Sequence, residues 1–279
     1  MQHLLSNVTA DDVIESPFPH VIIKDALDPE LYQALSQTFP DADLFAEDGK
    51  PLADNKSYRY AAHKIFANER VSDLWKEFVR AHVSQEFYTK FLEIFDKHIK
   101  RLYPNLPEVL GVAPEKMTAG PRGMGETGIA GMDAQFVYTT PVSEVSTSCP
   151  PHTDRERCLY GGMLYMRQEG DDSEGGDLDF YQFKPGKARY RVRRRLSIDN
   201  LDTVKTVHYD SNLFLIFLHS AQSLHGVSPR SVTPYPRRYI NFICEYPKKI
   251  YDINDGIEPR ISDLPARLLR QARSLYRSN

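Results

Sequence analysis

The sequence predicts an α+β fold in which a jelly-roll core lies between helical segments. Up to about residue 130, apolar residues recur mainly at helical spacing. Beyond that point the chain consists of short runs rich in aromatic and β-branched residues, with turn residues between them. We therefore expect a single domain, 1–279, with a mainly helical flank at 1–130, a jelly-roll core at 131–250 and a helical tail at 251–279.

The helical segments are recognised by their start and stop signals. Asp28 precedes Pro29, so a capping carboxylate is followed by a ring already fixed at a helical φ. The apolar pattern of 71–103 has Ser84 as a cap within it and is followed by a proline. In the tail, 262–276 has basic residues opposite apolar ones, which predicts an amphipathic helix. Such a helix is more often a docked terminus or an oligomer contact than a membrane anchor.

Eight short strands are predicted in the core, a number typical of a jelly roll. They cover 132–140, 158–167, 177–183, 189–198, 203–209, 213–218, 222–227 and 238–246. The fourth would carry Arg189, Arg191, Arg193 and Arg195 on one face. This arrangement predicts either a solvated strand or loop, or a contact with an anionic substrate or partner.

Composition excludes several functional classes. The formal net charge of -3 argues against a general nucleic-acid binder. The three cysteines, Cys149, Cys158 and Cys244, form no CxxC pair, so neither a disulfide framework nor a zinc knuckle is expected. The start of the chain lacks a signal-peptide pattern, and no apolar run is long enough to span a bilayer. These features predict a cytoplasmic protein.

Two His-x-Asp triplets, at 152–154 and 208–210, are candidate metal ligands. On a strand, residues i and i+2 face the same side, so each triplet could offer an imidazole and a carboxylate to one metal. A facial two-His-one-carboxylate iron site needs a further histidine from a distant strand. After Asp210 the farthest histidine is His225, only 225 − 210 = 15 residues away. This short separation favours His152 and Asp154.

The third ligand must then be His208, His219 or His225, and the surroundings favour His225. It ends an apolar strand pair, and a proline-rich turn and the strand 238–246 follow it. Arg238 shares a face of that strand with apolar residues, and a buried arginine is costly unless it meets an anion, preferably a carboxylate. Neither of the other two histidines has an arginine comparably placed after it. His219 is expected to be an ordinary core or surface residue.

Several motifs occur in the order seen in the iron(II)/2-oxoglutarate dioxygenases, and the chain most resembles their prolyl 4-hydroxylase-like branch. The motifs are Pro151-His152-Thr153-Asp154, Gly175-Gly176-Asp177-Leu178, Leu213-Phe214-Leu215-Ile216-Phe217, His225-Gly226-Val227-Ser228-Pro229 and Arg238-Tyr239.

The resemblance implies a double-stranded β-helix core in which His152, Asp154 and His225 ligate Fe(II). It also implies that Arg238 pairs with the distal carboxylate of 2-oxoglutarate. The gap of 238 − 225 = 13 residues is slightly longer than is usual in the family, and Arg230 and Arg237 lie nearby. The family often has a strand tyrosine that touches 2-oxoglutarate. Here the candidate is Tyr138, with a core tyrosine as the alternative.

The activity implied by the resemblance is hydroxylation of an unactivated C–H bond, with 2-oxoglutarate and O2 as co-substrates and succinate and CO2 as products. A small molecule, a saccharide and a peptide are all compatible substrates. Two alternatives remain: a cupin-type metalloenzyme that does not use 2-oxoglutarate, and a non-catalytic binding module on the same barrel. The first would leave Arg238 without a role, and the intact ligand set argues against the second.

Overall fold

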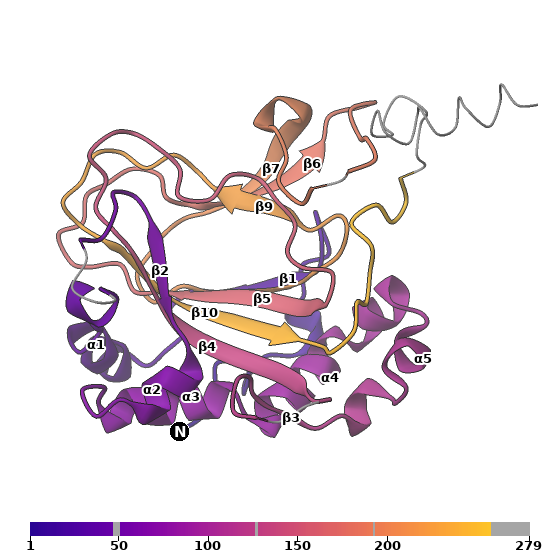
Figure 1. Ribbon diagram of the computed structural model, residues 1–279, viewed down its shortest axis with the longest axis horizontal. Coiled ribbons are helices and arrows are strands. Elements are labelled where there is room, and N and C mark those ends of the chain that lie inside the picture. The colour runs from indigo at the N-terminus through magenta and orange to yellow at the C-terminus, as the bar shows by residue number, and fades with distance from the viewer. Residues whose placement is uncertain (47–50, 126–127, 192, 258–279) are drawn as a thin grey trace, which may run out of the picture.

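Two β-sheets face each other, and helices gather along the outer side of the larger one, away from the smaller one (Figure 1). This computed structural model describes residues 1–46, 51–125, 128–191 and 193–257. The two sheets share a buried interior. One apolar cluster contains Met163 and Phe217 of the larger sheet together with Leu178 and Phe180 of the smaller sheet. The described residues contain no helix long and apolar enough to cross a membrane.

The larger sheet, called the major sheet here, has the strand order β1-β8-β5-β10-β4-β2, with β3 pairing in parallel beside β4. The smaller, or minor, sheet has the order β7-β6-β9. The strands of the major sheet are β1 (His20–Ile23), β2 (Ser57–Tyr60), β3 (Ala119–Pro121), β4 (Ala130–Thr139), β5 (Cys158–Tyr165), β8 (Phe214–Leu218) and β10 (Arg237–Glu245). Those of the minor sheet are β6 (Leu178–Phe183), β7 (Leu201–Val207) and β9 (Leu224–Val227).

The chain passes back and forth between the two sheets in the manner of a double-stranded β-helix. After β4 in the major sheet, a single-residue bridge between His152 and His225 on β9 extends the minor sheet. The chain then returns to the major sheet in β5, to the minor sheet in β6 and β7, and alternates again through β8, β9 and β10. The predicted α+β jelly-roll class is confirmed by this order.

The α-helices of the described residues are α1 (Pro29–Gln37), α2 (Ala62–Ala67), α3 (Asp73–His82), α4 (Gln85–Leu102) and α5 (Leu106–Leu110). The two predicted caps are present. Asp28 accepts hydrogen bonds from the backbone N–H groups of Glu30 and Leu31 at the start of α1. Ser84 accepts one from the N–H of Phe87 at the start of α4. These side chains satisfy donors that the first helical turn leaves unpaired.

The two faces of β10 meet different surroundings, and this decides which side chains reach the interior. Ile240 and Phe242 belong to the large cluster between the major sheet and the helices, where Phe242 lies against Phe78 of α3 and Phe87 of α4. Tyr239 belongs instead to the cluster between the two sheets. Because side chains alternate along a strand, odd-numbered positions of β10 face the interior of the sandwich.

One predicted strand is wrong. Residues 189–191 and 193–198 form no strand, apart from a single bridge between Arg195 and His152, while the other seven strands occur with ends shifted by one or two residues. Arg191 is buried, and its Nη2 donates to the backbone carbonyls of Ala221 and Ile253, so it is not on a solvated face. These local bonds replace the regular strand that the alternating arginines indicated. The helix predicted at 262–276 lies outside the described residues.

Candidate metal centre

The backbone brings His152 and His225 together at the edge of the minor sheet. The N–H of His152 donates to the carbonyl of His225 at 2.8 Å, and the N–H of His225 donates back to the carbonyl of His152 at 3.0 Å. The two rings lie with their centroids 4.4 Å apart. With Asp154, which follows on the same segment as His152, the three side chains place one ligand atom each within 4.8 Å of one another. We call these three residues the triad.

Backbone carbonyls set the orientation of both imidazole rings. Nδ1 of His225 is 2.9 Å from the carbonyl oxygen of Ser223, and Nδ1 of His152 is 3.0 Å from that of Pro150. A carbonyl can only accept, so each Nδ1 carries a hydrogen, and Nε2 is the ring atom left to meet a metal ion. Metal-binding histidines are commonly held in this way, with the second nitrogen donating to a carbonyl.

Asp154 is ionised and surrounded by imidazoles. Burial alone would raise the pKa of this carboxyl group, but His219, His225 and His152 together hold it well below its usual value. Its Oδ2 lies 3.4 Å from Nε2 of His225 and 3.2 Å from Nε2 of His219. Two imidazole nitrogens and one carboxylate oxygen form the donor set of a facial iron(II) site.

His219 lies beside the triad, although the sequence predicts it to be an ordinary core or surface residue. Its side chain is buried, which lowers its pKa to about 4, so the ring is neutral near pH 7. The ring fits because residue 161 is glycine: a Cβ there would lie 2.8 Å from Nε2 of His219. The sequence contains a signal for this position of His219. Phe217 faces the interior, and the residue two positions later faces the same side if the extended backbone continues.

The triad opens onto a cavity of about 470 Å³ between the two sheets. This volume lies within the range of small-molecule sites. Each sheet contributes apolar side chains to its walls, and amide groups come from the major sheet. The residues on these walls are Gln135, Met163, Leu178, Phe217, Tyr239 and Asn241.

Arg238 is not in this cavity. Its side chain points from β10 toward α1, where the guanidinium lies 5.1 Å from the ring of Phe39 and donates to the carbonyl of Met166 and to Ser36. As the alternation along the strand predicts, Arg238 lies on the face of Ile240 and Phe242. That face, however, packs against the helices, so the prediction that Arg238 faces the site is corrected.

Arg237 is the arginine of β10 that points into the interior. Its side chain is 1% exposed and lies over three tyrosine rings, with centroids 5.0 Å away for Tyr165, 5.1 Å for Tyr209 and 4.7 Å for Tyr239. Nε donates to the carbonyl of Gly176 and Nη2 to the hydroxyl of Tyr165. Among the described residues, Nη1 has no hydrogen-bond partner, and no carboxylate forms an ion pair with this guanidinium.

Tyr138 is also turned away from the triad. On β4 it pairs with Arg238 and stacks on Phe45 at 5.2 Å, on the helical side of the major sheet. There it lines a separate cavity together with Pro51. The reason is again the alternation along the strand, since Val137 takes the interior position. The alternative of a structural tyrosine fits this placement.

The second triplet does not contribute to the centre. His208 is exposed, and its Nδ1 lies 3.4 Å from Asp177. Within the described residues, the triad is the group of three such side chains close enough to share a metal ion.

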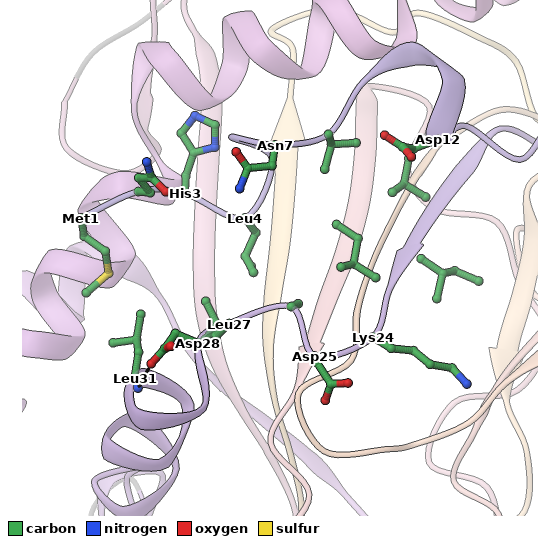
Figure 2. A pocket seen from close by; sticks show the side chains of 16 residues that line it. Met1, His3, Leu4, Asn7, Asp12, Lys24, Asp25, Leu27, Asp28 and Leu31 are labelled. Carbon is green, nitrogen blue, oxygen red and sulfur yellow. Dashed lines mark hydrogen bonds between the residues drawn. The ribbon is translucent and has the colours of Figure 1, made fainter.

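Another cavity, of about 660 Å³, lies between the N-terminal residues and the connection from β1 to α1 (Figure 2). Leu4 and Leu27 give it an apolar part, and two of its carboxylates, Asp12 and Asp28, have structural partners. Asp28 caps α1, and Asp12 accepts hydrogen bonds from Thr9. This cavity lacks a converging set of ligands, so we assign it no chemistry.

No model of a known protein family matches the chain, and no curated protein matches its sequence. Solved structures with a similar course of the chain include a prolyl-4-hydroxylase from Pseudomonas putida, with 14% sequence identity and a TM-score of 0.48. The alignment covers 87% of this chain and 98% of that one. A prolyl 4-hydroxylase from Phytophthora capsici has 15% identity and a TM-score of 0.47, with 88% and 64% covered. The rice dioxygenase for auxin oxidation has 13% identity and a TM-score of 0.44, with 86% and 80% covered.

Proposed function

We propose that this chain is an iron(II)- and 2-oxoglutarate-dependent dioxygenase that hydroxylates an unactivated C–H bond. The observation that carries the proposal is the presence, inside one sheet sandwich, of the triad and of a buried arginine whose Nη1 has no described partner. The triad fits the metal, and the arginine fits the far carboxylate of the 2-oxo acid.

In this proposal His152 and His225 hold iron(II) through Nε2, and Asp154 holds it through a carboxylate oxygen. Three protein ligands leave the remaining coordination positions to small molecules. When bound, iron(II) with 2-oxoglutarate and dioxygen supplies the oxidising chemistry and yields succinate and CO2. His219 is a positioning residue here: with its hydrogen on Nε2, it donates to Oδ2 of Asp154 and fixes the carboxylate.

We assign the co-substrate's distal carboxylate to Arg237 rather than to Arg238. A buried guanidinium without a counter-ion is costly, and a carboxylate that accepts from its free N–H groups would compensate for that cost. The three tyrosine rings around the guanidinium hold its plane and exclude water. Met163, Leu178 and Phe217 form apolar parts of the cavity wall, and Tyr239, one of the rings over Arg237, lines the same cavity.

The test is spectroscopic. Anaerobic addition of iron(II) and then 2-oxoglutarate to the purified chain should produce the weak visible charge-transfer band of a chelated 2-oxo acid. Admission of air should then release succinate slowly even without substrate. His225→Ala should abolish both signals. If folded protein binds iron(II) but shows no band, the cupin-type alternative replaces the proposal.

A further inference from the structure

Cationic side chains surround the cavity that leads to the triad. Six of its lining residues are cationic, whereas its carboxylates are Asp154 and Glu245. The cationic residues are Lys56, Arg59, Arg122, Arg155, Arg194 and Arg195. The excess of positive charge is therefore local, because the chain as a whole has a formal net charge of -3.

The two carboxylates are already engaged. Glu245 lies 3.3 Å from Nη1 of Arg122, 3.8 Å from Nη1 of Arg155 and 2.7 Å from Nη2 of Arg157. Asp154 lies among the imidazoles of the triad and His219. Neither carboxylate neutralises the rest of the cavity.

The remaining four, Lys56, Arg59, Arg194 and Arg195, are called the mouth cations here. All four are exposed, and within the described part of the chain none of them forms an ion pair with a carboxylate. Single exposed arginines without partners are common. Three such arginines and a lysine around the cavity of a candidate metal centre need a different explanation.

Backbone hydrogen bonds fix the mouth cations relative to the triad. The N–H of Thr153, between two ligands of the triad, donates to the carbonyl of Arg194 at 3.1 Å, and Arg195 bridges to His152. Across the cavity, Arg59 lies on β2, which pairs with β4 at the edge of the major sheet. The N–H of Lys56 donates to the side chain of Thr140 at 2.9 Å. The cations therefore come from two segments far apart in sequence, and each is held by the framework.

We infer that the substrate of the proposed dioxygenase is a small molecule that carries a phosphate or sulfate group, bound at this mouth by the mouth cations. This rests on the proposed function. Guanidinium groups bind tetrahedral oxyanions through paired N–H donors, and a cleft of one charge sign raises the local concentration of an opposite ligand. A cavity of about 470 Å³ suits a small ester rather than a folded partner.

The first experiment measures binding of inorganic pyrophosphate to the metal-free protein by calorimetry at low salt. One charge-assisted hydrogen bond contributes about 1.5–3 kcal/mol, and 1.4 kcal/mol corresponds to about tenfold in affinity. We therefore expect Arg194→Gln with Arg195→Gln, and separately Arg59→Gln, to weaken binding by about tenfold or more. Arg193→Gln is the matched control, because Arg193 is exposed in the same loop but does not line the cavity. It should leave the affinity within about twofold of the parent.

The iron(II)/2-oxoglutarate band, measured on the same proteins, separates the two proposals. Suppose that the band is present but pyrophosphate does not bind, or that it binds the Arg59 and Arg194/Arg195 variants as tightly as the Arg193 control. In either case the inference about the anion site is wrong and the proposed function stands. If pyrophosphate binds with the expected dependence but no band forms, the anion site stands and the dioxygenase assignment falls.

A competition measurement then tests the class of ligand. Glucose 6-phosphate or glucose 6-sulfate should displace pyrophosphate, whereas glucose at the same concentration should not, and the better of the two esters identifies the anion. If a polyglutamate peptide displaces pyrophosphate at a lower concentration of anionic groups than either ester, the small-ester inference is overturned in favour of an acidic peptide.

Discussion

Replacing Arg237 tests how the chain would bind a 2-oxo acid. Because the side chain is 1% exposed and Nη1 has no described partner, the carboxylate that it meets is desolvated along with it. Removing one member of such a buried pair costs roughly 3–5 kcal/mol, since the other charge stays uncompensated. At about 1.4 kcal/mol per tenfold, Arg237→Ala should weaken 2-oxoglutarate binding by at least about two orders of magnitude.

The assay is an anaerobic titration of the iron(II)-loaded protein with 2-oxoglutarate, followed by the charge-transfer band. Iron binding itself should survive, because no ligand of the triad is changed. Arg237→Lys should be intermediate, since the ammonium keeps the charge but loses the planar fork. It also guards against the possibility that the alanine variant does not fold, which thermal unfolding would detect.

The matched control is Arg238→Ala, one residue along the same strand. Arg238 packs on Phe39 and donates to the carbonyl of Met166, so its loss should lower the melting temperature while leaving the 2-oxoglutarate affinity within about twofold. The opposite pattern, with a hundredfold loss of affinity at Arg238 and little change at Arg237, would refute the assignment of the two faces of β10.

Further substitutions test the metal centre and the buried histidines. His225→Ala should abolish iron binding, while His208→Ala should leave the metal content unchanged, because His208 is exposed and does not belong to the triad. Metal analysis after desalting decides this. His219→Ala should weaken iron binding by about 10–100-fold. Gly161→Ala should have the same effect, because the added Cβ would lie 2.8 Å from Nε2 of His219 and would displace that ring. If both variants bind iron as tightly as the wild type, His219 has no positioning role. Burial lowers the pKa of His82 to about 3 from its ordinary 6.5, so the unfolded chain binds the proton more readily below pH 6.5. The contribution of His82 to the free energy of unfolding should therefore fall as the pH is lowered from 6.5 toward 3, by roughly 2–3 kcal/mol at pH 4.5. Urea unfolding at pH 7 and at pH 4.5 should show that the fall in the free energy of unfolding between these two pH values is smaller in His82→Gln than in the wild type. An equal fall in the two proteins would contradict this role of His82.

The features that could be predicted from the sequence are those governed by neighbouring residues. Asp28 and Ser84 were identified as caps because a cap is decided within one helical turn. Seven core strands were found because alternation and turn residues are local signals as well. The prediction of a strand at 189–198 was wrong. Its alternating arginines resemble the solvated face of a strand, whereas Arg191 donates to the carbonyls of Ala221 and Ile253, which are far away in sequence.

The choice between Arg237 and Arg238 could not be made from local sequence. The predicted alternation of side chains along β10 was correct, since Arg238 does share a face with Ile240 and Phe242. Both faces of the strand are buried, however, one against helices and the other against the minor sheet, and a one-residue change of position exchanges them. Only the packing of the helices, which is set by distant residues, determines which face becomes the interior.

The two anion-binding arrangements proposed for this chain differ in their exposure, and ionic strength should therefore separate them. Arg237 is buried beneath three tyrosine rings, and salt screens a buried pair only weakly. The mouth cations Arg59, Arg194 and Arg195 are exposed, and at 0.1 M salt exposed charges are screened over about 10 Å. Raising the salt from about 0.01 M to about 0.3 M should thus weaken pyrophosphate binding several-fold and leave the 2-oxoglutarate titration nearly unchanged. Equal salt dependence of the two ligands would mean that both bind at the exposed mouth, and Arg237 would then lose its assigned role.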